Sequence, residues 1–504
     1  MSNPSPLNHK YKKIYTENQT EVAEKLRSGS YDLVCGYGWS FLTPFLKFCN
    51  MLNLFSLFSE IEAKGYQRQM FSSEILLSLY LFKVLLGVKY LNEVTVKLFT
   101  DIGLMKLLGF SAKDLKQGTN KRGKGNSKPL HKDSLGDGMS NFLPEEVEKL
   151  FNEVIKKLIK FGILKGKITA IVDGTNLETT KLHEGCGKKT ITHKKRDKKG
   201  KLVEIEEHIY GFKVIYLYDY QSRIPLSVKI VQIQEHENQF LLELITQAEE
   251  NGAEIDKVLI DKGFIDGENL WRIKNEHGID FVIPSKSNMN ITELARNSSK
   301  MGVWQEREAD KKKKQHHLKL FGIENLRIWD EYRNPESRID KNSKRFLSDA
   351  LNAVVITEWK DNKFIGNEPV LLTSLPVDKP LEIDELYDLR SLIENTGNRE
   401  LKQAWNLKNS PQKTENALKA HVFMTLIGFS LCHAFRTVTG SDLEKYGDRI
   451  FRRNSLCNKV IVFSGKYYAI FDLEVFVNKR LEQFIRGSPD VENDFSKLEY
   501  SLVR

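Results

Sequence analysis

Cysteine is scarce in this chain, and no two cysteines form a Cys-x-x-Cys pattern. The five cysteines are scattered over 504 residues, which argues against a disulfide framework and predicts a reducing compartment. His183, Cys186 and His193 lie near one another in the sequence, but their spacing fits no common zinc site. We therefore do not expect a metal centre built on thiolates.

The sequence also lacks long hydrophobic runs. Its first residues, MSNPSPLNHKYKK, contain no apolar stretch of the kind found in a signal peptide. The longest apolar run near the C-terminus, Val422–Cys432, is too short to cross a bilayer and is typical of a buried helix. These features predict a cytoplasmic protein that does not use a membrane as a partner.

Acidic residues are outnumbered by basic ones. The chain has 77 Lys and Arg against 67 Asp and Glu, a formal net charge of +10. This balance favours a polyanionic partner, and nucleic acid ahead of membrane. Hydrophobic residues make up 40% of the chain, enough for a sizeable core, and the length indicates roughly two to four domains.

The pattern of apolar residues divides the chain into regions. Apolar residues at helical spacing predict helices up to about residue 115, as a module for DNA binding or for packing. A Gly-rich basic connector follows at Lys116–Lys128. We expect five regions: a helical one, an α/β one, a β-rich insertion, a second helical one and a tail that is a candidate for dimerisation, at 1–125, 126–286, 287–379, 380–440 and 441–504.

Within the α/β region, two runs of strand-forming residues each end in an aspartate. Asp173 follows the run Ile168–Val172, and Asp261 follows Lys257–Ile260. The order of strand, hairpin strands, helix, strand, helix and strand predicts a mixed sheet in which these two strands are neighbours. A carboxylate at the end of a buried strand is costly unless a metal or a cap compensates it. The alternative for Asp173 is an aspartate that opens a turn with Gly174.

The stretch Tyr387–Lys402 predicts a helix with a polar and an apolar stripe. At about 100° per residue, Tyr387, Arg390 and Glu394 share one stripe, and apolar residues form a neighbouring stripe that can face a core. A catalytic carboxylate needs such rigid support, with cations near it. The alternative is an ordinary amphipathic helix with an Arg–Glu pair.

A dense group of basic residues lies between the two aspartates. The segment Lys188–Lys201 holds eight Lys or Arg against one Asp, and we read it as a hairpin or loop tip that follows DNA phosphates through Lys194, Lys195 and Arg196. The alternative is a solvated turn. In the β-rich insertion, Trp304 is a candidate for stacking on an unpaired base, against packing in the insertion's own core.

Three segments together resemble the DDE transposases of bacterial insertion sequences. They are IVDGTN with Asp173, VLIDKGFIDGENL with Asp261, and YDLRSLIE with Glu394 ahead of ELKQAW. The resemblance is to the cut-and-paste class with a Tyr-x2-Arg-x3-Glu-x6-Lys signature, and Tyr387 and Arg390 match that signature by spacing.

The lysine of the signature departs from the pattern by one residue. Leu401 occupies the position seven residues after Glu394, and Lys402 follows it. A phosphate contact is the role that the signature gives this lysine. One alternative is that Gly397 disturbs the helix and restores the phase, and the other is that this chain has lost the role of the lysine. The resemblance covers roughly Pro144–Ser430.

The resemblance implies a catalytic centre and its cofactor. Asp173, Asp261 and Glu394 would be the catalytic residues and the ligands of two Mg²⁺ ions, for which Mn²⁺ would substitute. Carboxylates suit Mg²⁺ because it prefers hard oxygen ligands, and a metal pair supports in-line phosphoryl displacement. Tyr387 and Arg390 would hold phosphate oxygens or orient Glu394.

The resemblance also implies a fold, partners and a location. The fold is an RNase H-like mixed sheet flanked by helices, made of 126–286 and 380–440, with the β-rich insertion before the last catalytic helix. The partners are double-stranded DNA, as terminal inverted repeats and target, and a second copy of the chain in the DNA complex. The location is the nucleoid in a prokaryotic cytoplasm. The alternatives are an RNase H-like nuclease and a domesticated DNA-binding protein that no longer cuts.

Overall fold

The chain forms two compact units in a computed structural model. Unit 1 comprises Met1–Val154 and Leu401–Arg504, and unit 2 comprises Ile155–Glu400. The structure describes residues 15–37, 42–64, 71–110, 132–196, 202–300, 302–308, 316–336, 348–360, 363–366, 368–391, 393–439 and 459–472. Within these ranges, it does not describe the side chains at 42–44, 194–196, 202–203, 308, 316, 394–396 and 439.

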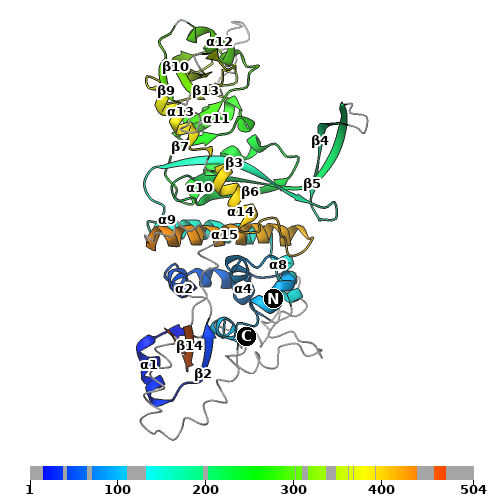
Figure 1. Cartoon of the computed structure of the whole chain (residues 1–504), viewed down its shortest axis with the longest axis vertical. Coiled ribbons are helices and arrows are strands. Elements are labelled where there is room, and N and C mark those ends of the chain that lie inside the picture. Colours follow the sequence, from blue (N-terminus) through cyan, green and yellow to red (C-terminus); the bar gives the residue numbers. More distant parts are fainter. Residues whose placement is uncertain are drawn as a thin grey trace. The chain divides into compact units, whose positions relative to one another are not determined.

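Helices dominate the described part of unit 1 (Figure 1). They are α1 (Gln19–Ser28), α2 (Leu42–Met51), α3 (Leu54–Ser59), α4 (Ser73–Leu85), α5 (Leu91–Lys97), α6 (Ile102–Leu107), α8 (Lys132–Asn141) and α15 (Glu415–Thr439). Helix α4 is apolar on all sides and buried from Ile75 to Leu85. Tyr80 on α4 shares a hydrogen bond of 2.8 Å with Nδ1 of His421 on α15, so buried polar groups as well as apolar packing join these helices.

Helix α15 is long and apolar enough to cross a membrane, but 94% of its most apolar window is buried inside the protein. The apolar run that the sequence analysis reads as a buried helix, Val422–Cys432, lies inside α15 and is buried throughout. That expectation is confirmed, and α15 has the burial of a core helix.

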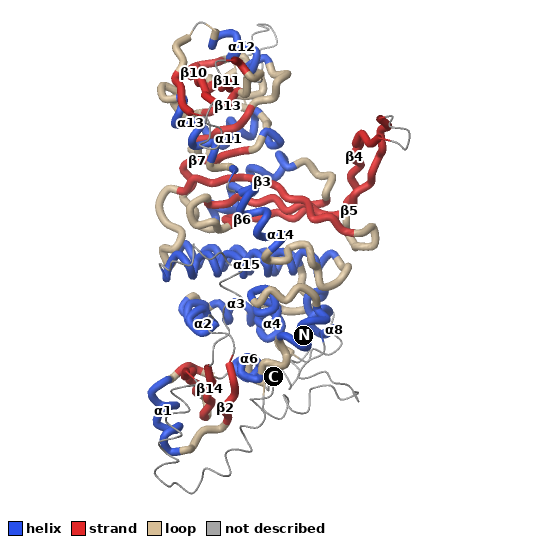
Figure 2. Tube along the Cα trace, in the orientation of Figure 1, coloured by secondary structure: helices blue, strands red, loops and turns tan. Residues whose placement is uncertain are grey.

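Unit 1 also contains a small sheet that the sequence analysis does not predict (Figure 2). Its order is β1-β15-β14-β2, built from Thr16–Glu17, Tyr467–Asp472, Lys459–Ser464 and Leu33–Tyr37. Strands from opposite ends of the chain thus pair with one another. Helix α1 packs on this sheet through Val22 and Leu26. The first region is therefore helical with strands added, and part of the C-terminal tail completes its sheet.

Unit 2 is built on one large mixed sheet. Its strands are β3 (Ile168–Thr179), β4 (Gly187–Arg196), β5 (Leu202–Asp219), β6 (Pro225–Gln232), β7 (Ile255–Ile260), β8 (Asp280–Pro284), β9 (Gln305–Glu308), β10 (His316–Leu326), β11 (Leu351–Lys360), β12 (Lys363–Phe364) and β13 (Val370–Thr373). The helices are α10 (Leu241–Glu250), α11 (Gly267–Asn275), α12 (Asn290–Ser299) and α13 (Pro380–Asp388). Helices α9 (Pro144–Lys160) and α14 (Arg399–Gln403) carry the chain across the unit boundaries.

The part of this sheet that bears the two aspartates has the order β6-β5-β3-β7-β8. Strands β6, β5 and β3 are antiparallel neighbours, while β3, β7 and β8 run parallel. This is the mixed α/β sheet flanked by helices that the sequence predicts, and the expected hairpin of β5 and β6 is present. Strands β3 and β7 form where β-branched residues follow one another, and Ile171, Val172 and Ile260 are fully buried.

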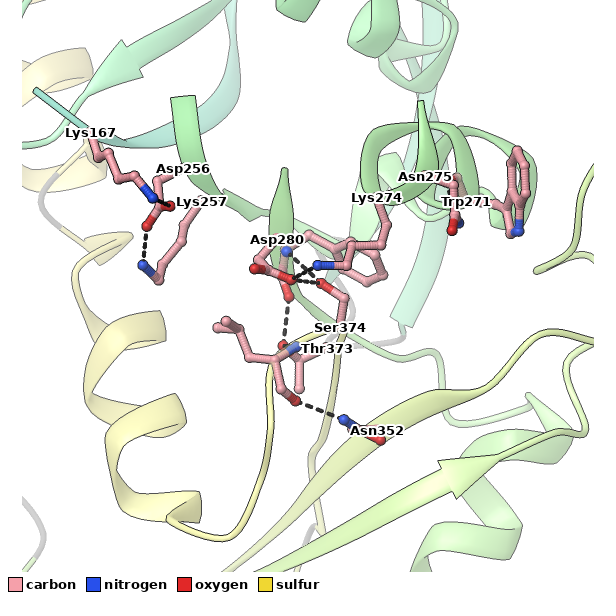
Figure 3. A network of polar contacts seen from close by, with 12 residues as sticks. Lys167, Asp256, Lys257, Trp271, Lys274, Asn275, Asp280, Asn352, Thr373 and Ser374 are labelled. Carbon is pink, nitrogen blue, oxygen red and sulfur yellow. Dashed lines mark hydrogen bonds and ion pairs between the residues drawn. The ribbon is translucent and has the colours of Figure 1, made fainter. Parts of the chain in front are cut away.

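The β-rich insertion extends the core sheet. Strand β13 pairs antiparallel with β8, and β11, β10 and β9 follow outward in that order. Asp280 at the start of β8 helps to anchor this junction, because its Oδ1 accepts hydrogen bonds from Lys274 (2.6 Å) and Ser374 (2.7 Å), as Figure 3 shows. The insertion also contains α12, which the sequence analysis does not predict. The residues around Tyr332 follow the end of β10 as irregular chain.

Strands β4 and β5 form a long two-stranded ribbon that projects from the sheet in Figure 1. The paired residues run from Gly187 opposite Gly211 to Arg196 opposite Leu202. The predicted basic hairpin is therefore mostly strand, and its tip at 197–201 lies outside the described residues.

Candidate active site

Asp173 and Asp261 come together because β3 and β7 pair in parallel register. The last paired residues are Val172 and Ile260, so the two aspartates are the next residues on neighbouring strands. The expectation that these strands are adjacent is confirmed. The position of Asp173 differs from expectation, since β3 continues to Thr179, opposite Tyr210 of β5. Only the pairing with β7 stops before Asp173, after Val172.

The carboxylate of Asp173 is held by two hydrogen bonds. Its Oδ1 accepts from the backbone N–H of Gly174 (2.9 Å), and its Oδ2 accepts from Nδ2 of Asn398 (2.8 Å). Burial raises the pKa of Asp173 to about 6; the Gly174 N–H and Arg390 oppose this rise, and Asp261 and Glu237 add to it. Several acidic groups thus act on one another here, as expected where a cation is to be bound.

Asp261 faces the arginine of the predicted signature. The carboxylate ends β7 and precedes the short turn η2 (Lys262–Phe264). Its Oδ1 lies 3.5 Å from Nη2 of Arg390, and their side chains are 34% and 15% exposed. The guanidinium of Arg390 also lies over the ring of Tyr387, 5.8 Å from its centroid. The structure therefore gathers Asp173, Asp261, Arg390 and Tyr387 in one place.

The predicted single helix over Tyr387–Lys402 is wrong. Helix α13 ends at Asp388, a turn follows, Ile393–Asn398 forms a π-helix (η3), and α14 begins at Arg399. A π-helical turn holds one residue more than an α-helical turn, and such turns are frequent at functional sites. Ile393 and Gly397 are buried one π-turn apart, and a Cβ on Gly397 would lie 3.3 Å from Cγ1 of Ile393.

The π-helix bears on two of the predicted site residues. Glu394 lies in η3, but its side chain is outside the described residues. Lys402 lies on α14, in unit 1, and is partly buried. Lys402 follows Glu394 by eight residues, and the π-helix lies between the two, from Ile393 to Asn398. The roles of both residues stay predictions.

Two residues at the site were missed by the sequence analysis. Asn398 donates to Asp173 and accepts from the buried hydroxyl of Tyr216, so it links η3 to β3 and β5. Glu237 lies in the short turn η1 (Glu237–Phe240) between β6 and α10. Neither residue belongs to a segment that carries the resemblance. A signal for Glu237 was present in the glycines that follow both aspartates, because a glycine allows close approach of another group.

The basic residues of the ribbon lie on β4, in a different segment of the chain from Asp173, Asp261 and Arg390. Lys194, Lys195 and Arg196 are on β4, opposite Glu204, Val203 and Leu202, and their side chains lie outside the described residues. Trp304 is half-buried, with its ring centroid 5.8 Å from that of Phe321 on β10. This contact agrees with packing inside the insertion, which the sequence analysis kept as the alternative.

The donor set of the site suits a hard divalent cation. It offers carboxylate oxygens from Asp173 and Asp261, which Mg²⁺ and Mn²⁺ prefer, and the pKa of Asp173 is raised mainly by burial, with smaller contributions from Asp261 and Glu237. Among the residues that the structure describes, no three or more His, Cys, Asp or Glu side chains form a group that could hold a metal ion.

Comparisons with known proteins support a family assignment. The model of the family described as "Transposase DDE domain" matches residues 164–430, more than half of the chain and all of the residues from Asp173 to Lys402. A cryo-EM structure of the piggyBac transposase synaptic complex with hairpin DNA is similar with 12% identity and a TM-score of 0.38, over 87% of this chain and 82% of that one. A search of curated proteins gave no match. Enzymes of the matched family use divalent metal ions to cleave DNA, and the assignment rests on the family match alone: this chain belongs to the transposase DDE domain family.

Proposed function

We propose that this protein is the transposase of a bacterial insertion sequence. It binds the terminal inverted repeats of the element, cleaves the element ends and joins them to target DNA by two-metal phosphoryl transfer. The observation that carries the proposal is the parallel register of β3 and β7, which makes Asp173 and Asp261 neighbours beside Arg390. Two carboxylates and a guanidinium, brought from three distant segments, suit the binding of cations and phosphate oxygens.

Each residue of the site has a distinct task in this proposal. When bound, a pair of Mg²⁺ or Mn²⁺ ions activates the attacking oxygen and stabilises the leaving oxygen. Asp173 and Asp261 hold the cations, and Asn398 and the Gly174 N–H fix the orientation of the Asp173 carboxylate. Glu394 is the third acidic ligand.

The cationic and aromatic residues act on the DNA phosphate. Arg390 is close enough to Asp261 to share its charge before DNA binds, and a phosphate oxygen is the alternative partner for its guanidinium. Tyr387 keeps the guanidinium in place through its ring face. Lys402 is assigned a further phosphate contact.

DNA outside the catalytic centre is bound by the ribbon of β4 and β5. Lys194, Lys195 and Arg196 follow one another on β4. Replacing the three with Gln should reduce the salt dependence of DNA binding by about one unit of slope for each phosphate that the protein no longer neutralises. The exposed lysines Lys160, Lys165 and Lys167 provide a control triple of equal charge. Equal slopes for the two triples would remove the ribbon from the interface.

The remaining parts of the proposal concern assembly and location. A second copy of the chain in the DNA complex would allow each active site to process one element end. The protein would act on the nucleoid in a prokaryotic cytoplasm, in keeping with its net charge of +10.

The proposal is tested by cleavage and joining of DNA that carries the element's ends. Asp173→Asn, Asp261→Asn and Glu394→Gln should each abolish Mg²⁺-dependent cleavage while DNA binding is kept. Asp256→Asn is the matched control, because Asp256 pairs with Lys167 and Lys257 at the opposite end of β7 (Figure 3). Asp266 is a poorer control, since it caps α11 by accepting from the N–H of Asn269.

The outcomes separate the transposase from its alternatives. Cleavage without joining would indicate an RNase H-like nuclease, and binding without cleavage by the unaltered protein would indicate a domesticated DNA-binding protein. Normal cleavage by Asp261→Asn would overturn the proposed site.

A further inference from the structure

Glu237 reaches the two motif aspartates from an element outside every motif. It begins the turn η1, between the end of β6 and the start of α10. Its side chain is 25% exposed, and its charge contributes to raising the pKa of Asp173. A third acid thus lies within electrostatic reach of the pair.

The glycines that follow the two aspartates make room for this side chain. A Cβ on Gly174, next to Asp173, would lie 2.8 Å from both Cδ and Oε1 of Glu237. A Cβ on Gly263 would lie 3.6 Å from Oδ2 of Asp261 and 3.8 Å from Oε2 of Glu237. Oδ2 of Asp261 and Oε2 of Glu237 therefore lie near the same position, the one that a Cβ on Gly263 would occupy.

One oxygen of Glu237 is anchored and the other is left for a second partner. Lys213 on β5 places its Nζ 3.0 Å from Oε1 of Glu237 and donates to the backbone carbonyl of Glu235 (2.8 Å). Only 7% of the Lys213 side chain is exposed, so the ammonium is a fixed, buried donor. The lysine holds the carboxylate in the orientation that turns Oε2 toward Gly263 and Asp261.

We propose that Glu237 is a fourth acidic residue of the metal site, which helps to hold a divalent cation together with Asp261. The inference rests on the proposed function, because it concerns the same cations. It also gives a reason for glycine at position 174, where any side chain would occupy the space of the Glu237 carboxylate. A purely structural Lys213–Glu237 ion pair would need neither the approach to Gly174 nor an oxygen directed at the space beside Asp261.

The test is the binding of Mn²⁺ to the full-length protein without DNA, with free Mn²⁺ counted by electron paramagnetic resonance. Glu237→Gln keeps the shape and the hydrogen bond to Lys213 but removes the charge. We expect its dissociation constant for Mn²⁺ to rise by roughly tenfold or more, the scale of loss when a supporting group of a metal site is removed. Glu243→Gln is the matched control, since Glu243 pairs with Lys229 at 2.7 Å and lies on α10.

A second variant keeps the test independent of the Glu237 substitution. Gly174→Ala places a methyl group against the flexible end of Glu237, so the carboxylate must move while the fold is retained. This variant should weaken Mn²⁺ binding in the same direction, with a thermal unfolding curve close to that of the unaltered protein. Wild-type Mn²⁺ affinity in either Glu237→Gln or Gly174→Ala would overturn the inference.

Asp261→Asn separates this inference from the proposed function. Loss of Mn²⁺ binding in Asp261→Asn but not in Glu237→Gln would refute the role of Glu237 and leave the proposed function standing. Unchanged Mn²⁺ binding in Asp261→Asn, or no Mn²⁺ binding by the unaltered protein, would contradict both.

Discussion

The site has two halves that the sequence specifies in different ways. The strand half consists of β3 and β7 with Asp173 and Asp261, and the helical half consists of residues 380–398 with Tyr387, Arg390 and Asn398. In the strand half, a ladder of backbone hydrogen bonds fixes the register, and a slip of one residue would turn a buried side chain to the opposite face. In the helical half, Tyr387 lies on α13, Arg390 in the turn that follows it and Asn398 on the π-helix η3, so no single helical phase sets the positions of these side chains.

The two halves differ in what fixes the positions of their side chains. The strand half is positioned by its own buried core residues. The helical half relies on side chains from other elements, and Arg307 of β9 is the clearest case. Its guanidinium contacts the carboxylates of Asp384 and Asp388 on α13, the latter at 3.0 Å. The insertion thus helps to position the helix that carries Tyr387.

The largest effect should follow from breaking this anchor of the helical half. Arg307→Gln leaves Asp384, which is 6% exposed, without its cation. Burial already raises the pKa of Asp384, and Arg307 opposes that rise. We expect a loss of about 2–4 kcal/mol in the free energy of unfolding, measured in urea. Arg272→Gln on α11, whose partners Glu268 and Glu276 are exposed, should change it less, and equal losses would contradict the anchoring role.

A smaller effect of opposite sign should come from the strand half. The folded state raises the pKa of Asp173 from 3.8 to about 6, so between these values the folded protein binds a proton that the unfolded chain does not. Stability therefore falls as pH rises through this window, by about 3 kcal/mol in all. Without metal, Asp173→Asn should be more stable than the unaltered protein at pH 7, by about 1–3 kcal/mol.

This prediction is checked by urea unfolding in EDTA across the same pH range. The advantage of Asp173→Asn should shrink below pH 6 and vanish near pH 4, where the folded protein keeps the Asp173 carboxyl protonated and the unfolded chain begins to protonate it. If Asp173→Asn is less stable than the unaltered protein at pH 7, the charged Asp173 carboxylate does not destabilise the folded state.

The smallest effect concerns the hydrogen bond that joins the two halves. Asn398→Ala removes the donor to Asp173 and the acceptor of the Tyr216 hydroxyl, which should cost about 1 kcal/mol. In a double-mutant cycle with Asp173→Asn, the two changes should be non-additive. Asn352→Ala removes a comparable hydrogen bond, to the carbonyl of Leu375 at 2.8 Å, and should be additive. Additivity for Asn398 would mean that the halves are energetically independent.

Local patterns in the sequence were sufficient to predict the strand half. The runs before Asp173 and Asp261 contain the β-branched residues that form buried strands, and the order of elements made these strands neighbours. The end of β3 was misjudged because its pairing with β5 continues beyond Asp173 to Thr179. That pairing depends on a second strand and leaves little local signal.

Long-range and phase-dependent features escaped prediction. The sheet of unit 1 pairs Leu33–Tyr37 with strands beyond residue 458, and no local pattern specifies partners so far apart. A fixed 100° per residue cannot register the π-turn at Ile393–Asn398, because the extra residue is a property of packing. Glu237 and Asn398 were missed because each acts through a partner on a different element.

The central claim is that Asp173 and Asp261 share a divalent metal site, and diffraction from crystals containing Mn²⁺ tests it most directly. The account predicts an anomalous peak bound to oxygens of both aspartates at about 2.1 Å, with Arg390 released from Asp261. An Mn²⁺ peak elsewhere on the chain, or an Asp261–Arg390 pair that persists with no peak beside it, would contradict the account.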